Sequence, residues 1–304
     1  MILTYHSVLD ERWRPWIDPT YGVTARQFER HVAFLAKHRN VISMSELEAY
    51  VADGRTPPKG SVVITFDDGY LNNLTTAAPI LARAGLPATF YLATGYVSER
   101  RNQWIDTVFV AFRRRRLHHL EFGGHRYDLG AWSDEQRAHA ALCNTLLPAS
   151  LPERREILDD VRRQLKPDAR PPALTMGWRD VQALKAFSAD FEFGAHTRHH
   201  LDLSALPRDE VKVEVADSVA DVEDELDQEV RHFSYPFGRL DSSGGEVIRE
   251  LGLSSAVLTE PAGAIGAGSN LHALPRQTAR GRQLLFRSRA TIHAPLMDRS
   301  AVNN

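Results

Sequence analysis

Residues 62–69 have the sequence Val-Val-Ile-Thr-Phe-Asp-Asp-Gly, and this pattern indicates the architecture of the chain. The first five residues are apolar or β-branched, which is typical of a parallel strand buried on both faces. Two carboxylates, Asp67 and Asp68, follow at its carboxyl end. Parallel α/β folds build their sites there, and charges at that end are costly unless a metal ion, an arginine or solvent meets them. The dipeptide alone is equally consistent with a strand-to-helix turn in which Asp68 caps a helix.

Short apolar runs alternate with segments of helical periodicity on both sides of this strand. Capping-box sequences at residues 24–27 and 43–46 predict two helix starts, and Gly85 predicts the end of a helix over about 74–84. Repeated strand–helix units predict a parallel α/β fold, and roughly seven strands in such a chain favour a barrel over an open sheet. The other strand-like runs lie at residues 2–5, 88–93, 192–195, 232–235 and 255–259.

Residues 99–173 interrupt this alternation. They are rich in charged residues and prolines and contain the run Arg113–Arg116. We interpret them as a mostly helical insertion in a single domain that spans residues 1–304. The arginine run is more typical of a solvated helix face than of a site for phosphate or a polyanion.

Composition narrows the range of functions. The 304 residues include 37 Lys and Arg against 39 Asp and Glu, so the near-neutral charge of −2 gives no reason to expect nucleic acid as a partner. The single cysteine, Cys143, excludes an internal disulfide and a multi-cysteine zinc site. No apolar run approaches the roughly 18 residues of a membrane span. Because Met1 leads directly into a strand-like run, we expect a cytoplasmic protein. The sequence does not indicate an oligomeric state.

A second motif, His196-Thr197-Arg198-His199-His200, follows the strand-like run at 192–195. If this segment is helical, the four-residue spacing places His196 and His200 on one face and leaves His199 out of phase. Neutral imidazoles at that spacing are good ligands for zinc or a similar ion. A histidine pair alone is weak evidence. Together with an aspartate from another strand end it gives the three-ligand pattern of a catalytic metal site.

Two weaker signals complete the set of candidate residues. The turn Tyr235-Pro236-Phe237-Gly238 combines rigid aromatic walls with exposed backbone N–H groups, which suit an oxyanion site or a sugar-stacking surface; an ordinary turn is the alternative. His6 lies at the end of the first strand-like run, where it is either a general acid or a core histidine.

Taken in order, these motifs resemble those of the polysaccharide deacetylases of carbohydrate esterase family 4, the NodB-homology domain. The matching segments are Thr65 to Gly69, His196 to His200 and Pro236 to Gly238, and the resemblance extends from about residue 3 to residue 276. It implies an irregular barrel of about seven strand–helix units.

The resemblance also implies roles for individual residues. Asp67 would be the general base, and the backbone N–H of Phe237 would help to hold the oxyanion. Asp68, His196 and His200 would bind the metal, which is usually zinc in this family. From the residues alone, cobalt, nickel, manganese or iron would fit the same ligands.

Two positions depart from the family pattern. Most members have an arginine, paired with the catalytic aspartate, where this chain has Ser234; we expect Arg276 to supply that guanidinium. The late Leu-x-His motif that supplies the general acid has only a loose match at Thr291-Ile292-His293. We favour His6 over His293, because an exopolysaccharide-type branch with permuted motifs opens with a similar Tyr-His.

The expected function is metal-dependent hydrolysis of N-acetyl groups on amino sugars of an oligo- or polysaccharide, or of its lipid- or nucleotide-linked precursor. A lipid-linked substrate would associate the protein with a membrane. Alternatives are a deformylase, another deacylase, an O-acetyl esterase, a non-catalytic carbohydrate-binding barrel, or an interaction protein that docks through Arg113–Arg116. Trp178 and Tyr70 are as plausible in the core as in the site. The expected sugar-binding residues are Tyr70, Tyr235, Pro236, Phe237 and Trp178.

Overall fold

The strand predicted from residues 62–66 is β5 (Ser61–Phe66), which lies inside a parallel sheet in the computed structural model. The structure describes residues 1–240, 242–259 and 263–279. The principal strands are ordered β11-β10-β9-β6-β5-β1-β12, and each pairs in parallel with its neighbours. Besides β5 they are β1 (Ile2–Tyr5), β6 (Ala88–Leu92), β9 (Phe191–Ala195), β10 (His232–Ser234), β11 (Ser255–Val257) and β12 (Arg276–Thr278).

The sheet curves into a nearly closed barrel. β12 pairs with β1 through the register Ile2 to Arg276. Leu274, two residues before β12, forms a parallel bridge to Val257 of β11. The last described segment therefore contacts both edges of the sheet. The expected irregular seven-stranded barrel is confirmed.

Successive side chains of β5 point alternately into two different hydrophobic clusters. Ile64 and Phe66 join the larger cluster, which includes residues of the outer helices. Val63 belongs to a smaller cluster with Ile2 and Tyr91 of the neighbouring strands, which fills the barrel interior. Because successive residues of a strand point to opposite faces, Thr65 and Asp67 lie on the same inner side as Val63. This alternation brings the first carboxylate into the mouth of the barrel.

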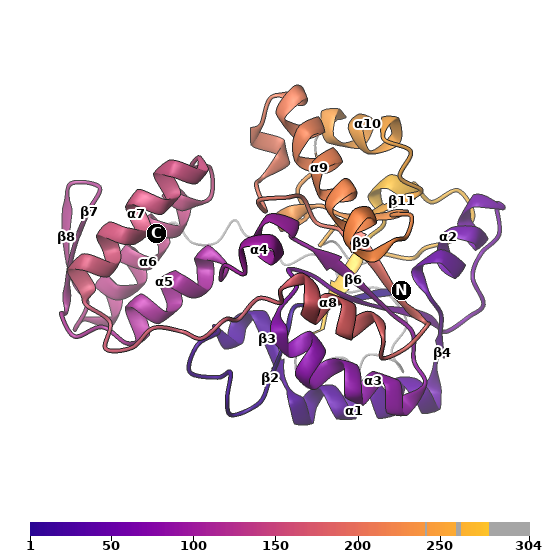
Figure 1. Cartoon of the computed structure of the whole chain (residues 1–304), viewed down its shortest axis with the longest axis horizontal. Coiled ribbons are helices and arrows are strands. Elements are labelled where there is room, and N and C mark those ends of the chain that lie inside the picture. Colours follow the sequence, from indigo (N-terminus) through magenta and orange to yellow (C-terminus); the bar gives the residue numbers. More distant parts are fainter. Residues whose placement is uncertain (241, 260–262, 280–304) are drawn as a thin grey trace, which may run out of the picture.

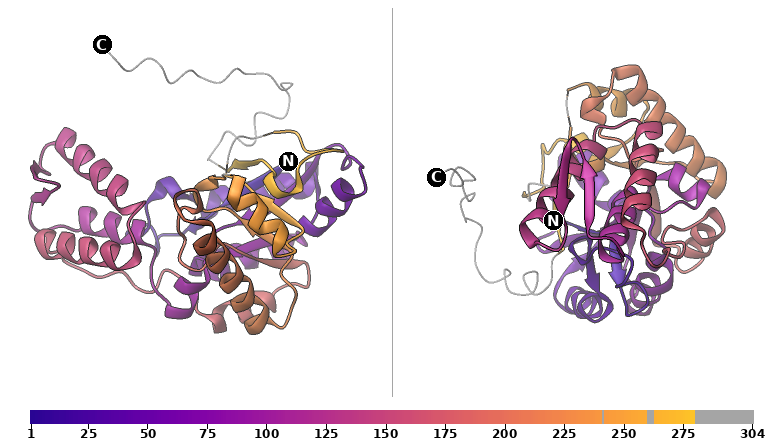
Figure 2. Two further views of the ribbon diagram at one scale, coloured as in Figure 1. Left: turned by 90° about the horizontal axis from the view of Figure 1, so that it is seen from above. Right: turned by 90° about the vertical axis from the view of Figure 1, so that its left-hand side faces the viewer.

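Helices cover the outside of the barrel (Figures 1 and 2). Both predicted capping boxes are present, at the starts of α1 and α2, and Gly85 ends α3 with a left-handed φ of 62°. α2 packs Met44 and Leu47 against the cluster in the barrel interior. The helices are α1 (Ala25–His38), α2 (Met44–Ala52), α3 (Ala78–Ala84), α4 (Thr94–Glu99), α8 (Trp178–Lys185), α9 (Arg208–Leu226) and α10 (Ser242–Glu250).

Shorter elements complete the barrel. The strands β2 (Ser7–Leu9) and β3 (Gly22–Thr24) pair with each other, and β4 (Asn40–Val41) pairs with β5. A π-helical turn at Asn73–Ala77 leads into α3. Turns of 3-10 helix lie at Pro19–Tyr21, Leu203–Ala205, Pro236–Gly238 and Leu271–Ala273. Among the described residues, no helix combines the length and the apolar character needed to cross a membrane.

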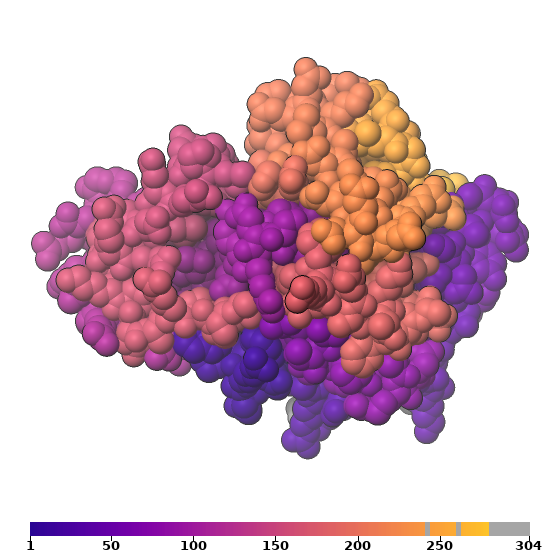
Figure 3. Space-filling view, in the orientation of Figure 1, coloured from indigo at the N-terminus to yellow at the C-terminus, as the bar shows by residue number. Residues whose placement is uncertain are grey.

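Residues 103–165 form a helical lobe that projects from one side of the barrel, and the surface is indented between it and the region of α9 (Figures 1 and 3). Its own apolar cluster includes Val108, Leu142 and Val161, one from each of its three helices. A β-hairpin, which was not predicted, forms its outer end (Figure 2). The elements are α5 (Trp104–Arg113), β7 (His119–Phe122), β8 (His125–Asp128), α6 (Trp132–Leu146) and α7 (Leu151–Leu165).

The arginine run at residues 113–116 is partly engaged by nearby carboxylates. The Arg114 Nε lies 2.7 Å from Asp168 Oδ1, and the Arg115 Nη2 lies 3.0 Å from Glu135 Oε2. Arg115 is also tied to the backbone by a 2.7 Å hydrogen bond to Leu129 O. The expected solvated helix face is therefore not what the structure shows, because only Arg113 belongs to α5 and the following arginines lie in the loop after it.

Candidate active site

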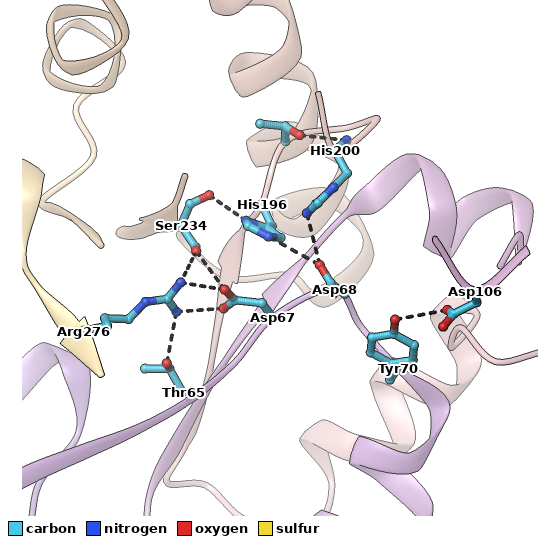
Figure 4. Close-up of polar contacts among 10 residues, drawn as sticks. Thr65, Asp67, Asp68, Tyr70, Asp106, His196, His200, Ser234 and Arg276 are labelled. Atoms are coloured by element: carbon cyan, nitrogen blue, oxygen red, sulfur yellow. Dashed lines mark hydrogen bonds and ion pairs between the residues drawn. The ribbon is translucent and has the colours of Figure 1, made fainter. Parts of the chain in front are cut away.

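The chemistry-bearing motifs meet at one end of the barrel. Asp67 and Asp68 follow β5, His196 and His200 follow β9, and Ser234 ends β10. Figure 4 shows their side chains converging, with Arg276 of β12 approaching from the opposite side. Segments far apart in the sequence thus form one cluster, because parallel strands deliver their ends to a common edge.

Asp67 and Arg276 form a two-pronged ion pair that is almost completely buried. Arg276 Nη1 donates to Oδ1 of Asp67 at 2.8 Å, and Nη2 donates to Oδ2 at 2.6 Å. Asp67 is 1% exposed and Arg276 is 0% exposed. The same guanidinium donates from Nη1 to Thr65 Oγ1 at 3.1 Å and from Nε to Leu258 O at 2.7 Å. The expected pairing of Arg276 with Asp67 is confirmed.

Ser234 completes the cradle around this pair. Its hydroxyl accepts a hydrogen bond from Arg276 Nη2 at 2.9 Å and donates one to Asp67 Oδ2 at 3.2 Å. Burial is the largest single influence and raises the pKa of Asp67, but the charge and hydrogen bonds of Arg276 and the charge of His196 together hold that pKa below its usual range. The carboxylate is therefore ionised at neutral pH and fixed in orientation.

Asp68, His196 and His200 form the second half of the site. One ligand atom from each lies within 4.8 Å of the other two, which fits a metal ion. Oδ1 of Asp68 is 3.5 Å from His196 Nε2 and 3.2 Å from His200 Nε2. That buried oxygen has no hydrogen-bond partner among the described residues. A buried carboxylate oxygen facing two imidazole nitrogens has the donor chemistry of a divalent-cation site.

The electrostatics of the two histidines also fit a cation. The Nδ1 of His196 hydrogen-bonds the carbonyl of Ser234 at 2.6 Å, which directs Nε2 toward Asp68. Burial lowers the pKa of His196, but Asp67 and Asp68 outweigh burial and raise it, so this position favours positive charge. Burial lowers the pKa of His200 and keeps its imidazole neutral, the form that ligates metals.

The loop that carries the two histidines is not a helical turn, contrary to the expectation. Thr197 and His200 have left-handed φ values of 60° and 52°, so a bend of the chain brings the imidazoles together. Their rings lie 4.8 Å apart, centroid to centroid. The prediction that His199 stays outside the group agrees with its contact, since His199 Nδ1 lies 2.6 Å from Glu214 Oε1.

Backbone strain is concentrated at this site. Asp68, Thr197, His200 and Phe237 are four of the seven described non-glycine residues with positive φ. Each such residue costs on the order of 1–3 kcal/mol and persists only when its surroundings fix it. At His200, for example, the backbone N–H donates a hydrogen bond to Thr197 Oγ1 at 2.9 Å.

Phe237, in the turn that begins at Pro236, contacts the group formed by Asp68, His196 and His200. Its ring contacts His200 edge-on, with centroids 4.7 Å apart, and it packs against the apolar cluster of the helical lobe. A φ of 59° turns its backbone out of the 3-10 geometry. The hydrogen bonds that close the turn are donated by the N–H groups of Gly238 and Arg239. Within the described part of the chain, the N–H of Phe237 donates no hydrogen bond.

These residues border a cavity of about 420 Å³. Its walls include Asp67, Asp68, His196, His200, His6, Tyr70 and Phe237. The volume lies in the range of small-molecule sites. His6 faces the ring of Tyr21, with centroids 6.5 Å apart, and its carbonyl accepts a hydrogen bond from Asn73. The rival general acid, His293, lies outside the described residues.

The expected sugar-binding aromatics divide into two groups. Tyr70 and Phe237 border the cavity. Tyr235 is 0% exposed in the larger core cluster, and its hydroxyl donates to His272 O, so its ring presents no face to a sugar. Pro236 is buried, and Trp178 packs against the core while its indole donates to Ser98 Oγ at 3.0 Å. Pro236 and Trp178, like Tyr235, do not border the cavity. The expectation that these three residues stack on a sugar is therefore not supported.

Sequence reasoning did not identify the residues of the helical lobe that border the cavity. Gln103, Trp104, Ile105, Asn144 and Leu147 border the same cavity. Tyr70 also donates its hydroxyl to Asp106 Oδ2 of α5 at 3.0 Å, and burial raises the pKa of Asp106 well above its usual range. No motif marks these residues, because their role depends on how α5 and α6 fold over the barrel mouth.

The barrel, the buried Asp–Arg pair and the Asp–His–His group define a hydrolase-like site in an α/β barrel. The chain belongs to the polysaccharide deacetylase family: a sequence model of that family, described as "Polysaccharide deacetylase", matches residues 54–145 and 159–256. The resemblance stated from the motifs is thereby confirmed.

Relatives agree with this assignment. The poly-beta-1,6-N-acetyl-D-glucosamine N-deacetylase of Staphylococcus aureus (strain MSSA476) is 30% identical over 120 residues, which are 39% of this chain and 38% of that protein. The chain thus matches less than half the length of this curated relative.

Two solved structures share the fold. The Streptococcus pyogenes deacetylase PplD in complex with acetate aligns with a TM-score of 0.60 at 18% identity, covering 91% of each chain. The structure of IcaB from Ammonifex degensii aligns with a TM-score of 0.60 at 19% identity, covering 92% of this chain and 91% of that one.

Proposed function

We propose that the protein is a metal-dependent N-deacetylase that removes acetyl groups from amino sugars of an oligo- or polysaccharide, releasing acetate and a free amine. One observation carries the proposal. The ionised carboxylate Asp67, held by Arg276, lies beside the group Asp68, His196 and His200 at the wall of a single cavity. A fixed base beside a cation site is what hydrolysis of an unreactive amide requires.

Asp68, His196 and His200 would hold the metal, for which zinc is the first choice given two imidazoles and one carboxylate. When bound, such an ion supplies Lewis-acid polarisation of the acetyl carbonyl and makes a water ionisable near neutral pH. Three protein ligands leave positions open for that chemistry, as in other catalytic sites.

The chain's own residues supply the proton transfers. Asp67 takes a proton from the attacking water, and Arg276 and Ser234 hold both of its oxygens in place during that step. The free N–H of Phe237 donates to the oxygen on which negative charge develops, a contribution on the order of 3 kcal/mol. His6, which borders the same cavity, protonates the leaving nitrogen. The products are acetate and an amino sugar.

The proposed substrate is a β-linked N-acetylglucosamine oligomer or polymer of the exopolysaccharide type. The Staphylococcus aureus relative is named for poly-β-1,6-N-acetyl-D-glucosamine, which motivates this choice. Tyr21, Trp104 and Phe237 give the cavity aromatic walls on which the apolar face of a pyranose ring can pack.

Acetate release from β-1,6-linked N-acetylglucosamine oligomers tests the proposal. The purified protein is stripped with EDTA, assayed, and assayed again after zinc is restored. We expect release only with the metal, together with one new amine per acetate. Absence of release from these oligomers, from β-1,4-linked oligomers and from nucleotide-linked N-acetyl sugars, with metal present, would contradict it. Formate or O-acetyl release instead would redirect the assignment to the alternative hydrolases.

A further inference from the structure

The helical lobe supplies one side of the cavity that the barrel site opens into. At α5 the residues that border it are Gln103, which immediately precedes the helix, and Trp104 and Ile105 in its first turn; at α6 they are Asn144 in the last turn and Leu147, which immediately follows the helix. The lobe therefore does more than pack on the barrel, because it forms part of the wall of the cavity that Asp67 borders.

Gln103 is the unusual residue of this wall. It is 3% exposed, yet its Nε2 has no hydrogen-bond partner among the residues that the structure describes. A buried amide donor without a partner costs free energy, and most such groups in folded proteins are satisfied. Because Gln103 also borders the cavity, we take an oxygen atom of a bound ligand as the missing partner.

The backbone around Gln103 is held firmly. Its carbonyl accepts hydrogen bonds from the N–H of Thr107 at 3.2 Å and from the hydroxyl of Thr107 at 3.3 Å. The preceding Asn102 is fastened by its side chain to Pro172 O at 2.9 Å and to Leu174 N at 2.7 Å. Asp106, one turn further, accepts the 3.0 Å hydrogen bond from Tyr70. The backbone that carries the amide is thus fixed relative to the barrel site before anything binds.

We propose that Gln103 is a substrate-binding residue that donates a hydrogen bond from Nε2 to a hydroxyl or acyl oxygen of the bound amino sugar. Trp104 and Leu147, which border the cavity beside it, provide an apolar surface for the C–H face of the same sugar. Substrate selection in this chain then depends on the lobe as well as on the barrel. The inference rests on the proposed function, because Gln103 would bind the substrate of that reaction.

The role is tested with Gln103→Met, which keeps the length of the side chain and removes the amide. Gln164→Met is the matched control, because Gln164 also lies in the lobe, but its side chain binds the hairpin backbone: Nε2 donates to Glu121 O at 3.0 Å, and Oε1 accepts from Glu121 N at 2.8 Å. Each variant is measured for Tm, for kcat and KM in zinc-dependent acetate release, and for Kd. The Kd is measured by calorimetry with a β-1,6-linked N-acetylglucosamine tetramer in the inactive Asp67→Asn background.

The two variants should behave in opposite ways. Gln103→Met should raise KM and Kd about threefold to tenfold, as expected for one lost hydrogen bond, while kcat changes less than about twofold and Tm does not fall. Gln164→Met should lower Tm and leave KM and Kd unchanged. Unchanged KM and Kd for Gln103→Met in an active parent would overturn this inference alone. A parent that neither binds nor deacetylates any of these sugars would contradict the proposed function, and the role of Gln103 with it.

Discussion

At the scale of single residues, the site depends on one buried ion pair. Asp67 is 1% exposed at the cavity wall, and its pKa stays low because Arg276 binds both of its oxygens and His196 lies nearby. Removal of one partner from such a pair leaves an uncompensated buried charge, which costs about 3–5 kcal/mol. The serine between them adjusts to both charges, as its hydroxyl can accept and donate at once.

Arg276→Lys should keep the positive charge and lose the two-pronged geometry. With less stabilisation of the carboxylate, the pKa of Asp67 rises, so the acidic limb of the kcat/KM profile should move to higher pH. We expect kcat to fall by about 10- to 100-fold, with the bound metal retained. The pH profile and metal content measure both effects, and Arg231→Lys, in a surface ion pair with Glu48, is the control. A wild-type profile for Arg276→Lys would contradict the pairing role.

His6→Gln should abolish protonation of the leaving nitrogen. The expected result is a loss in kcat of about 10²- to 10⁴-fold, since a positioned general acid contributes that much, with unchanged KM for a bound oligomer. His125→Gln, in the exposed hairpin of the lobe, controls for loss of a histidine. A fully active His6→Gln protein would transfer the role elsewhere, with His293 the first residue to test.

Most of these residues could be predicted from the sequence, because the motifs are short and local. Asp67, Asp68, His196 and His200 meet as expected, although a left-handed bend brings the histidines together instead of a helix. Tyr235 was misassigned, because burial of an aromatic ring depends on elements distant in the sequence.

At the scale of elements, the strands carry both the core and the site. β10 shows both roles. Ser234 at its end donates a hydrogen bond to Asp67, and His232 at its start is buried against α2 and β11. His232 hydrogen-bonds Ser45 Oγ at 3.0 Å and Ser255 Oγ at 2.9 Å. The strands could be predicted from their short apolar runs, and the helix starts from the capping-box sequences. The short 3-10 and π-helical turns were not, because tertiary contacts determine them.

Burial lowers the pKa of His232 to about 4, and this predicts a pH dependence of stability. The folded protein binds this proton less readily than the unfolded chain, whose histidine pKa is about 6.5. The contribution is complete above pH 6.5 and is lost as the pH falls toward 4, by at most about 3 kcal/mol. His232→Gln should therefore flatten the stability profile between pH 6.5 and 4, as measured by urea unfolding. Equal slopes for both proteins would contradict it.

At the scale of the whole molecule, a helical lobe projects from one side of a barrel (Figure 1), and residues at its base border the cavity of the barrel site. Composition predicted that residues 99–173 are mostly helical, but it did not predict the hairpin, the separate apolar cluster or the individual residues that border the cavity. Which residues border it depends on where α5 and α6 lie in space. The Tyr70–Asp106 hydrogen bond links the lobe to the motif that begins with Thr65.

Asp106→Asn should stabilise the protein at neutral and alkaline pH. Burial raises the pKa of Asp106, so the folded state keeps a proton that the unfolded chain releases above about pH 4. Wild-type stability therefore decreases as the pH rises from 4, and the amide removes this penalty. The Tm of the variant should exceed that of the wild type by at least about 2 °C at pH 7.5 and by less near pH 4. A lower Tm for the variant at both pH values would show that the carboxyl is needed for the link.

Simultaneous measurement of metal binding and turnover in wild type and Asp67→Asn tests the central claim most directly. Both proteins are stripped with EDTA and titrated with zinc, while bound metal and acetate release from the N-acetylglucosamine tetramer are recorded. Asp68, His196 and His200 hold the metal and Asp67 acts as the base, so both proteins should bind one zinc ion and only the wild type should release acetate. Loss of zinc by Asp67→Asn, or acetate release by the metal-free wild type, would contradict this division of roles.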